Sequence, residues 1–205
     1  MHVRSAIMII MNDATGPDGL PVMTFADAAA WQAWLVTQPA AARGAWLRFA
    51  KKGTALTTVT YADALDTALC YGWIDGQKRT YDTASFLIRF TLRGSTSVWS
   101  QVNRTKAEAL IAAGRMQPAG QAAIARAQAN GRWDTAYAPA SRARVPEDLR
   151  AALDANPAAA AFFATLTGNN RYAILYRVTT TRKPATRSRK IAEFVAMLER
   201  GETLH

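Results

Sequence analysis

The stretch Ala68–Asn103, ALCYGWIDGQKRTYDTASFLIRFTLRGSTSVWSQVN, decides the fold because it combines a hairpin pattern with a dense mixture of aromatic and charged side chains. Residues 73–80 and 85–92 are typical of two strands joined by a turn at residues 81–84. Side chains alternate along a strand, so every second residue shares a face. We therefore expect one apolar face that packs on helices, and an opposite face that carries Trp73, Asp75 and Arg89 together.

Several residues of this stretch are candidates for a ligand-binding groove, because apolar walls with a few placed polar groups are typical of binding pockets. The candidates are Trp73, Asp75, Lys78, Arg89, Arg93, Trp99, Ser100 and Asn103. Two guanidinium groups on one strand face would suit a carboxylate or a phosphate, and a neighbouring aspartate would orient them. The alternative interpretation is a core hairpin whose aspartate and arginine side chains pair with one another.

The rest of the chain is mostly helical by its apolar spacing, with one further strand at residues 45–51. Thr24 is expected to cap a helix that runs to Thr37, and Thr60 to cap a helix that ends before Gly72. Asn169 or Asn170 is expected to cap another. The remaining helices are expected at residues 100–113, 118–131, 146–155, 156–166 and 184–201.

These elements predict a helix-rich α+β fold with a small antiparallel sheet and helices packed around it. We expect a flexible lead-in at residues 1–20 and an α+β domain at residues 21–145. A helical C-terminal part at residues 146–205 is expected to pack on that domain and form one compact unit.

The rare residue types exclude several kinds of chemistry. The chain has one cysteine and two histidines, His2 and His205, which stand at its ends. An internal disulfide, a Ser-His-Asp triad and a His-ligated metal site are therefore not expected. Cys70 is interpreted as a buried structural residue. No glycine-rich phosphate loop or carboxylate cluster occurs, so neither a cofactor nor a metal is predicted.

The apolar run near the N-terminus is too short for a membrane span or for the core of a secretory signal, so we expect a cytoplasmic protein. The formal net charge is +10. Half of this excess lies after residue 170, where eight Lys or Arg residues stand against three Glu residues. The candidates for a nucleic-acid contact are Arg182, Lys183, Arg187, Arg189 and Lys190. The alternative interpretation of this segment is a solvated basic face.

Six motifs carry a resemblance to a known family. They are ALCYGWIDG (68–76), RFTLR (89–93), SVWSQVN (97–103), GRMQPAG (114–120), GRW (131–133) and TRSRKI (186–191). With these motifs the chain resembles the YdeI/OmpD-associated family of bacteriocin-protection proteins, from about residue 20 to residue 204. Leu92 departs from the family pattern, which usually has proline there.

The resemblance implies a role in stress protection against bacteriocins or antimicrobial peptides, and its name implies association with a porin. It implies no catalytic residue. The first hypothesis is therefore a non-enzymatic protein whose groove binds a small anionic or peptide ligand. The alternatives are a nucleic-acid-associated protein that uses the basic C-terminal segment, and an enzyme that uses Asp75 as a general base.

Overall fold

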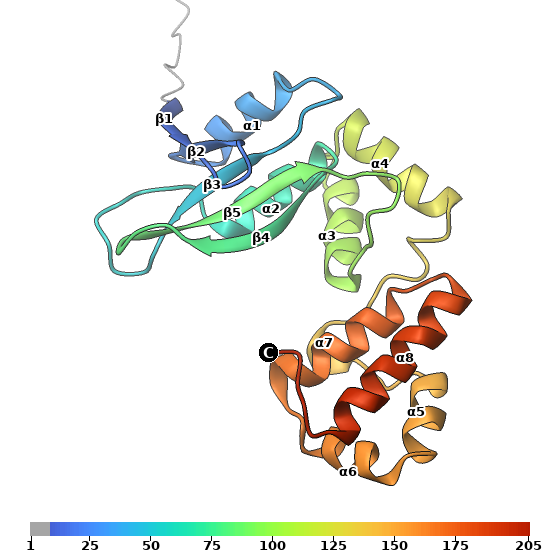
Figure 1. The fold of residues 1–205 in the computed structure, drawn as a ribbon. Helices are drawn as coiled ribbons and strands as arrows, with labels where there is room; N and C mark the ends of the chain where they lie inside the picture. The colour runs from blue at the N-terminus through green and yellow to red at the C-terminus, as the bar shows by residue number, and fades with distance from the viewer. Residues whose placement is uncertain (1–8) are drawn as a thin grey trace, which may run out of the picture. The chain divides into compact units, whose positions relative to one another are not determined.

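The computed structural model describes residues 9–205, which form two units (Figure 1). The first unit comprises the described residues up to Ser97 together with Asn103–Asp134, and the second comprises Val98–Val102 and Thr135–His205. The helix-rich α+β class predicted from the sequence is confirmed. The domain boundary expected after residue 145 stays a prediction.

A five-stranded mixed sheet organises the first unit, with the strand order β1-β2-β3-β5-β4. Its strands are β1 (Ile9–Thr15), β2 (Pro21–Phe25), β3 (Ala45–Ala50), β4 (Trp73–Thr80) and β5 (Ser85–Leu92). The β4–β5 hairpin and the β3 strand lie where the sequence predicted them. The expected antiparallel sheet needs one correction, because β2 and β3 are parallel. Parallel strands require a crossover connection, and this connection contains the helix α1 (Ala28–Val36).

The N-terminal segment contains more strand than expected. Of the predicted flexible lead-in, residues 1–8 lie outside the described residues, whereas β1 pairs with β2. Thr24 does not cap a helix, because it lies within β2. Asp27 caps α1 instead, and its Oδ1 accepts a hydrogen bond of 2.8 Å from the backbone N–H of Ala30. The β2 residues 22–25 are all buried, which explains why a strand forms here.

Three further helices complete the first unit (Figure 1): α2 (Tyr61–Cys70), α3 (Gln101–Ala112) and α4 (Pro118–Ala129). Thr60 caps α2 as predicted. The main core of this unit joins one face of the sheet to α1 and α2. Trp31 of α1 is fully buried, and its ring lies 5.6 Å from that of Phe90 on β5. The indole N–H of Trp31 donates to the carbonyl of Ala64 on α2, so the polar edge of this core residue is satisfied.

Two of the sequence motifs meet in one close backbone contact. The backbone N–H of Gln117 donates to the carbonyl of Cys70 at 3.1 Å, where α4 begins against the end of α2. A Cβ atom at Gly120 would stand 2.3 Å from that same carbonyl oxygen. Gly72 follows α2 with φ of +74°, and a Cβ there would stand 2.8 Å from the carbonyl oxygen of Ala119. Both motifs therefore need glycine, because the two backbones leave no room for a side chain.

The second unit is helical and has its own apolar core (Figure 1). Its elements are the short 3-10 helix η1 (Ala140–Arg142), α5 (Glu147–Asp154), α6 (Pro157–Thr165), α7 (Gly168–Thr179) and α8 (Pro184–Glu199). Asn156 caps α6 by accepting from the backbone N–H of Ala159. The helix α7 begins before the caps expected at Asn169 or Asn170, because Thr167 holds the N-cap position. The segment around Trp99 joins this unit through backbone hydrogen bonds with Tyr137.

Candidate functional site

The sheet face opposite α1 and α2 carries three arginines around one tryptophan. Trp46 on β3 lies opposite Arg89 on β5, and Arg48 lies opposite Leu87. Arg79 on β4 also lies opposite Leu87, so these side chains share a face. Trp46 and Leu87 pack in a small apolar cluster that is separate from the main core. This face therefore combines an apolar centre with a positively charged surround.

Arg89 is held by the turn that joins β1 and β2. Its Nε lies 3.0 Å from Oδ2 of Asp18, and the indole N–H of Trp46 donates to Oδ1 of Asp18 at 2.8 Å. The hydrogen bond from Trp46, with a smaller contribution from the Arg89 charge, lowers the pKa of Asp18 below its ordinary value. Asp18 is therefore ionised at neutral pH. It accepts a hydrogen bond from Trp46 and pairs with the charge of Arg89, although the Arg89 Nε–H makes no hydrogen bond of good geometry.

Part of Arg89 is available for an external partner. About a third of its side chain is exposed, and its two terminal nitrogens make no hydrogen bond within the described residues. Arg79 is exposed, and its guanidinium carbon lies 5.9 Å from the centre of the Trp46 ring. Arg79 has no acidic partner within residues 9–205. Two guanidinium groups beside one aromatic ring therefore remain able to receive an anion.

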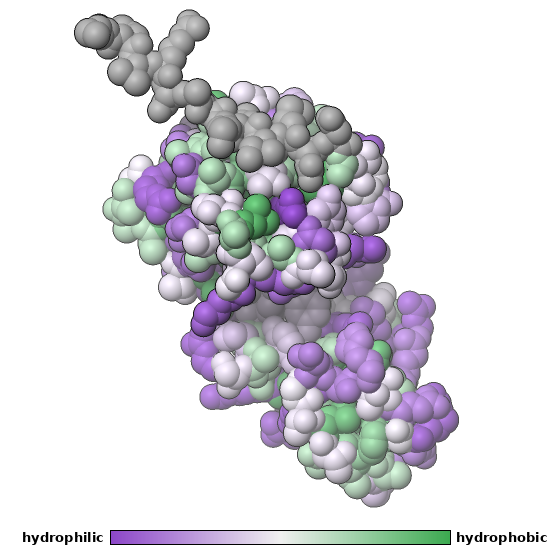
Figure 2. Space-filling view, turned by 90° about the vertical axis from the view of Figure 1, so that its left-hand side faces the viewer, coloured by the Kyte–Doolittle hydropathy of each residue, from purple (hydrophilic) through white to green (hydrophobic). Residues whose placement is uncertain are grey.

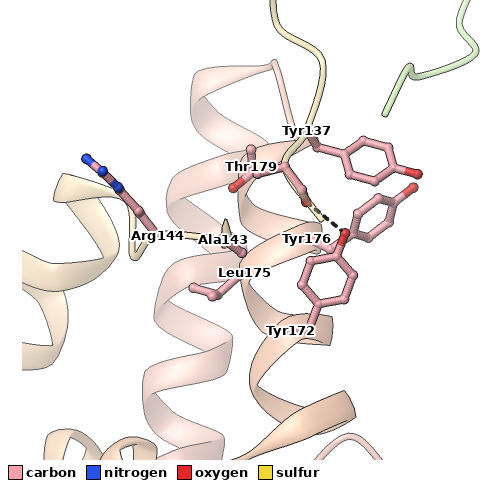
Figure 3. A pocket seen from close by; sticks show the side chains of 8 residues that line it. Tyr137, Ala143, Arg144, Tyr172, Leu175, Tyr176 and Thr179 are labelled. Atoms are coloured by element: carbon pink, nitrogen blue, oxygen red, sulfur yellow. Dashed lines mark hydrogen bonds between the residues drawn. The ribbon is translucent and has the colours of Figure 1, made fainter. Parts of the chain in front are cut away.

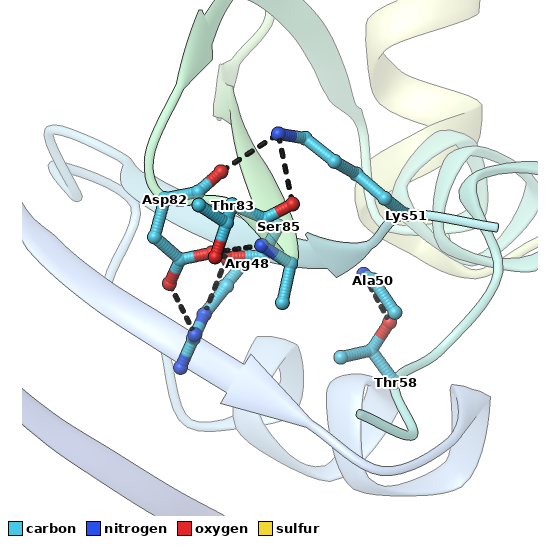
Figure 4. Close-up of polar contacts among 8 residues, drawn as sticks. Arg48, Ala50, Lys51, Thr58, Asp82, Thr83 and Ser85 are labelled. Atoms are coloured by element: carbon cyan, nitrogen blue, oxygen red, sulfur yellow. Dashed lines mark hydrogen bonds and ion pairs between the residues drawn. The ribbon is translucent and has the colours of Figure 1, made fainter. Parts of the chain in front are cut away.

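The third arginine of this face is already neutralised (Figure 4). Arg48 donates from Nη2 to Oδ2 of Asp82 at 2.6 Å and from Nε to the hydroxyl of Ser85. Ser85 in turn donates to Oδ1 of Asp82, and Lys51 donates to the backbone carbonyl of Asp82. These bonds tie the β4–β5 turn to β3. Arg48 therefore has a structural role at the end of the sheet.

Three of the predicted groove residues lie on the helix-covered face instead. Asp75 pairs with Phe90, so its side chain points to the face opposite Arg89, and the expected common face of Asp75 and Arg89 does not form. Asp75 accepts a hydrogen bond of 2.8 Å from the hydroxyl of Tyr61 on α2. Trp73 is 2% exposed and belongs to the main core. Lys78 is exposed and lies over the ring of Phe86.

The other predicted groove residues are distributed over both units. Arg93 is buried in the first unit, where its backbone N–H donates to the carbonyl of Gly72. Asn103 is half-buried on α3 and also belongs to the first unit. Trp99 and Ser100 are buried and belong to the second unit. Binding by these residues stays a prediction, as does the use of Asp75 as a general base.

Sequence reasoning missed Asp18, Trp46 and Arg79 as parts of a charged face. A signal for Trp46 was present, because the alternation at residues 45–51 already separated Trp46 and Arg48 from Leu47 and Phe49. The Asp18-Gly19 pair is also a typical hairpin turn. It would have placed Asp18 between two strands.

Cys70 matches its sequence interpretation as a buried structural residue. It is 4% exposed at the end of α2, and burial raises the pKa of its thiol. A neutral buried thiol is a poor nucleophile.

The basic C-terminal segment is largely engaged in internal contacts. Arg187 binds Asp148 of α5 through two nitrogens, Nε at 2.5 Å and Nη2 at 2.9 Å, and also donates to the carbonyl of Val178. Lys190 donates to the hydroxyl of Thr181. Both residues belong to the first turns of α8, but their charged groups reach the C-terminal end of α7, where the helix dipole favours positive charge.

The other three predicted nucleic-acid residues are exposed at the start of α8. Arg189 forms an ion pair with Glu193 at 3.6 Å, and both side chains are largely exposed. Lys183 occupies the N-cap position of α8, and Arg182 precedes it. A contact between this segment and nucleic acid stays a prediction.

A tyrosine cluster surrounds a small pocket in the second unit (Figure 3). The rings of Tyr137 and Tyr176 meet edge to face at 4.9 Å, and the hydroxyl of Tyr172 donates to the carbonyl of Ala138. Burial raises the pKa of Tyr172. The pocket holds about 90 Å³, which is small for a ligand site, and we interpret the cluster as packing between α7 and the segment before η1.

The described surface offers little that points to a metal or a membrane. Among residues 9–205, no three His, Cys, Asp or Glu side chains gather as metal ligands, and no helix is long and apolar enough to cross a bilayer. On the face drawn in Figure 2, hydrophilic residues are interspersed with pale and green ones. Charged groups and pockets are therefore the features that can define a site.

The fold and its charged face define a class of protein: an α+β unit with arginines beside a tryptophan, together with a helical unit in the same chain. Comparison with family models divides the chain in a similar way. Residues 23–123 match a domain of unknown function (DUF8412), and residues 142–201 match the family described as Bacteriocin-protection, YdeI or OmpD-Associated.

The match over residues 142–201 supports the YdeI/OmpD-associated family suggested by the motifs, for the C-terminal part of the chain alone. Of the six motifs, TRSRKI lies in this matched segment, whereas four of the others lie within residues 23–123. At the level of the family, the indicated function is of the bacteriocin-protection type, and the description also names OmpD association. The chain matches no curated protein and no solved structure.

Proposed function

We propose that this protein is a non-enzymatic, protection-type binding protein, and that the sheet face around Trp46 binds a small carboxylate or phosphate. The observation that carries the proposal is the geometry of Arg89, whose Nε contacts Asp18 while its two terminal nitrogens stay available on a partly exposed side chain. Arg79 supplies a second guanidinium group on the same face. Charge-assisted bonds from paired guanidinium nitrogens are strong and directional, so this arrangement favours planar or tetrahedral oxyanions.

Asp18 has a defined part in this proposal. Its carboxylate holds Arg89 from one side and reduces the positive charge of the face. It therefore lowers the affinity of the face for an anion, but it leaves the terminal nitrogens of Arg89 accessible. Of the groove expected from the sequence, the proposal retains Arg89. Asp75 and Trp73 are directed to the other face.

The proposal is tested by titrating the protein with succinate, citrate and inorganic phosphate at low ionic strength. Arg89→Ala and Arg79→Ala should each weaken binding. Asp18→Asn should tighten it by no more than about fivefold, because it removes one negative charge from the face and exposed ion pairs are weak. Arg104→Ala is a matched control, because Arg104 also places its Nε 3.0 Å from a carboxylate, that of Glu108, on an exposed helix surface.

The result that would overturn the proposal is equal affinity for these anions in the native protein and in Arg89→Ala. A second measurement addresses protection itself. In a bacterial host sensitive to a bacteriocin, survival should be raised by the native protein and by Arg104→Ala, but less by Arg89→Ala. Equal survival with all three proteins would show that protection does not depend on the sheet face around Trp46.

A further inference from the structure

A second pocket lies entirely within the helical unit, among α5, α6 and the beginning of α7. Its volume is about 540 Å³, and small-molecule sites commonly measure roughly 300–1,000 Å³. The buried side chains of Leu153, Phe163 and Leu166 supply an apolar lining. All of its lining residues fall within residues 142–201, the segment that matches the YdeI/OmpD-associated family.

Arg171 is held rigidly at this pocket. Its guanidinium carbon lies 4.4 Å from the centre of the Phe163 ring, and its Nη1 donates to the carbonyl of Phe163 at 3.3 Å. The stacking and the hydrogen bond fix the plane of the guanidinium group. Its Nε and Nη2 make no hydrogen bond within the described residues, so a preoriented edge remains for a ligand.

Arg150 and Asp154 add charges of both signs to the same pocket. They are four residues apart on α5, where side chains are neighbours on the helix surface. Nevertheless they form no ion pair with each other, and neither has another side-chain partner within residues 9–205. The pocket therefore presents two guanidinium groups and one carboxylate whose charges are not satisfied internally.

We propose that this pocket binds the zwitterion of a free amino acid with an apolar side chain. The ligand carboxylate binds Arg171 and Arg150, its ammonium group binds Asp154, and its side chain packs on the apolar lining. A simple anion leaves Asp154 without a partner, and a simple cation leaves the two arginines without one. A ligand with both charges satisfies all three groups, since each receives a partner of opposite sign. This site is independent of the face around Trp46.

The experiment is calorimetric titration of the full chain with three ligands that differ by one charge each. L-leucine carries both charges, N-acetyl-L-leucine lacks the ammonium group, and L-leucinamide lacks the carboxylate. We expect L-leucine to bind at least about tenfold more tightly than either derivative. Equal affinity for L-leucine and N-acetyl-L-leucine would overturn the zwitterion proposal. The absence of L-leucine binding at ligand concentrations of about tens of millimolar would overturn it as well.

Variants of the lining residues test which side chain binds each charged group of the ligand, and whether the ligand lies in this pocket. Asp154→Asn should remove the preference for L-leucine over N-acetyl-L-leucine. Arg171→Gln should reduce the preference for L-leucine over L-leucinamide, and Arg150→Gln with Arg171→Gln should remove it. Ala164 and Ala161 are both exposed alanines of α6, but only Ala164 lines the pocket. Ala164→Leu therefore places a larger side chain at the pocket and should abolish binding, whereas Ala161→Leu is the matched control. Unchanged L-leucine affinity in Ala164→Leu, with native helicity by circular dichroism, would overturn the location.

Discussion

Gly120 leaves no space for even a methyl side chain. A Cβ atom added there would stand 2.3 Å from the carbonyl oxygen of Cys70 and 2.4 Å from Sδ of Met116. The methionine side chain can move, but the backbone carbonyl at the end of α2 cannot move without separating α2 from α4. We therefore expect Gly120→Ala to lower the free energy of unfolding by about 1–3 kcal/mol, the usual cost of overpacking. Urea denaturation followed by tryptophan fluorescence measures this change.

Gly76 provides the comparison for Gly120. A Cβ there would meet no atom closer than 3.6 Å, and its φ is not in the left-handed region. Gly76→Ala should change the stability by no more than about 0.5 kcal/mol, as exposed substitutions usually do. Equal losses in the two alanine variants would show that the close contact between α2 and α4 has no energetic weight.

The candidate site was predicted only in part, and the reason lies in the strand register. The sequence placed Arg89 on a face opposite Phe90, and the structure agrees. It could not place Asp75, because the β4–β5 pairing is irregular between Asp75 and Lys78. Residues that face each other across a hairpin depend on such irregularities, which leave no clear trace in alternation. The turn signal at Asp18 could have placed it between two strands, but its pairing with Arg89 on β5 depends on the order of the strands in the sheet.

At the scale of elements, the Asp148–Arg187 pair joins α5 to α8 and makes their packing dependent on pH. The hydrogen bonds and charge of Arg187 lower the pKa of Asp148 from its ordinary value of 3.8. A carboxyl group whose pKa is lowered by folding stabilises the protein above its unfolded pKa, and this contribution is lost as the pH falls through the folded pKa. Asp148→Asn should cost up to about 1 kcal/mol at neutral pH, since the pair is partly exposed.

The measurement is the free energy of unfolding of both proteins between neutral pH and about pH 2. The difference between native protein and Asp148→Asn should be largest at neutral pH and should disappear below the folded pKa. Glu202→Gln is the control, because Glu202 pairs with Arg200 on an exposed surface two residues away. A constant difference at every pH would mean that Asp148 acts through its shape and not through its charge.

Helices were predicted more accurately than the N-terminal strands, and capping explains the difference. Thr60 and Asn156 indicate the starts of their helices, because each is an N-cap whose side chain accepts a hydrogen bond from the backbone N–H three residues later. Thr24 and Asp27 are both suitable caps, and the sequence alone did not decide between them. Burial of β2 between β1 and β3 decided it, and that pairing is a tertiary effect.

At the scale of the whole molecule, each unit has its own core, and the two main clusters share no residue. Leu149 is fully buried in the helical unit, and Leu47 on β3 is fully buried in the main core of the sheet unit. We expect Leu149→Ala to destabilise by about 2–5 kcal/mol. In hydrogen exchange, this loss should appear in the amides of α5–α8, whereas those of β3 and β5 should keep their protection.

Leu47→Ala is the reciprocal variant and should lower protection in the sheet while α5–α8 are retained. Equal loss of protection throughout the described residues in both variants would show that the units unfold in a single cooperative step. The sequence anticipated a change from mixed to purely helical structure along the chain. It did not anticipate that residues 98–102 belong with the later part, because that assignment depends on backbone bonds to Tyr137.

The position of β3 in the sheet has a consequence for synthesis on the ribosome. Its neighbour β2 emerges before it, but its other neighbour, β5, is separated from it in the chain by α2 and β4. During translation, one hydrogen-bonding edge of β3 therefore stays open until residue 92 has emerged. An open apolar strand edge is a template for pairing with other nascent chains. Slow translation of residues 50–92 should therefore favour aggregation. Rapid translation of the same residues should allow β5 to pair with β3 sooner and close this edge.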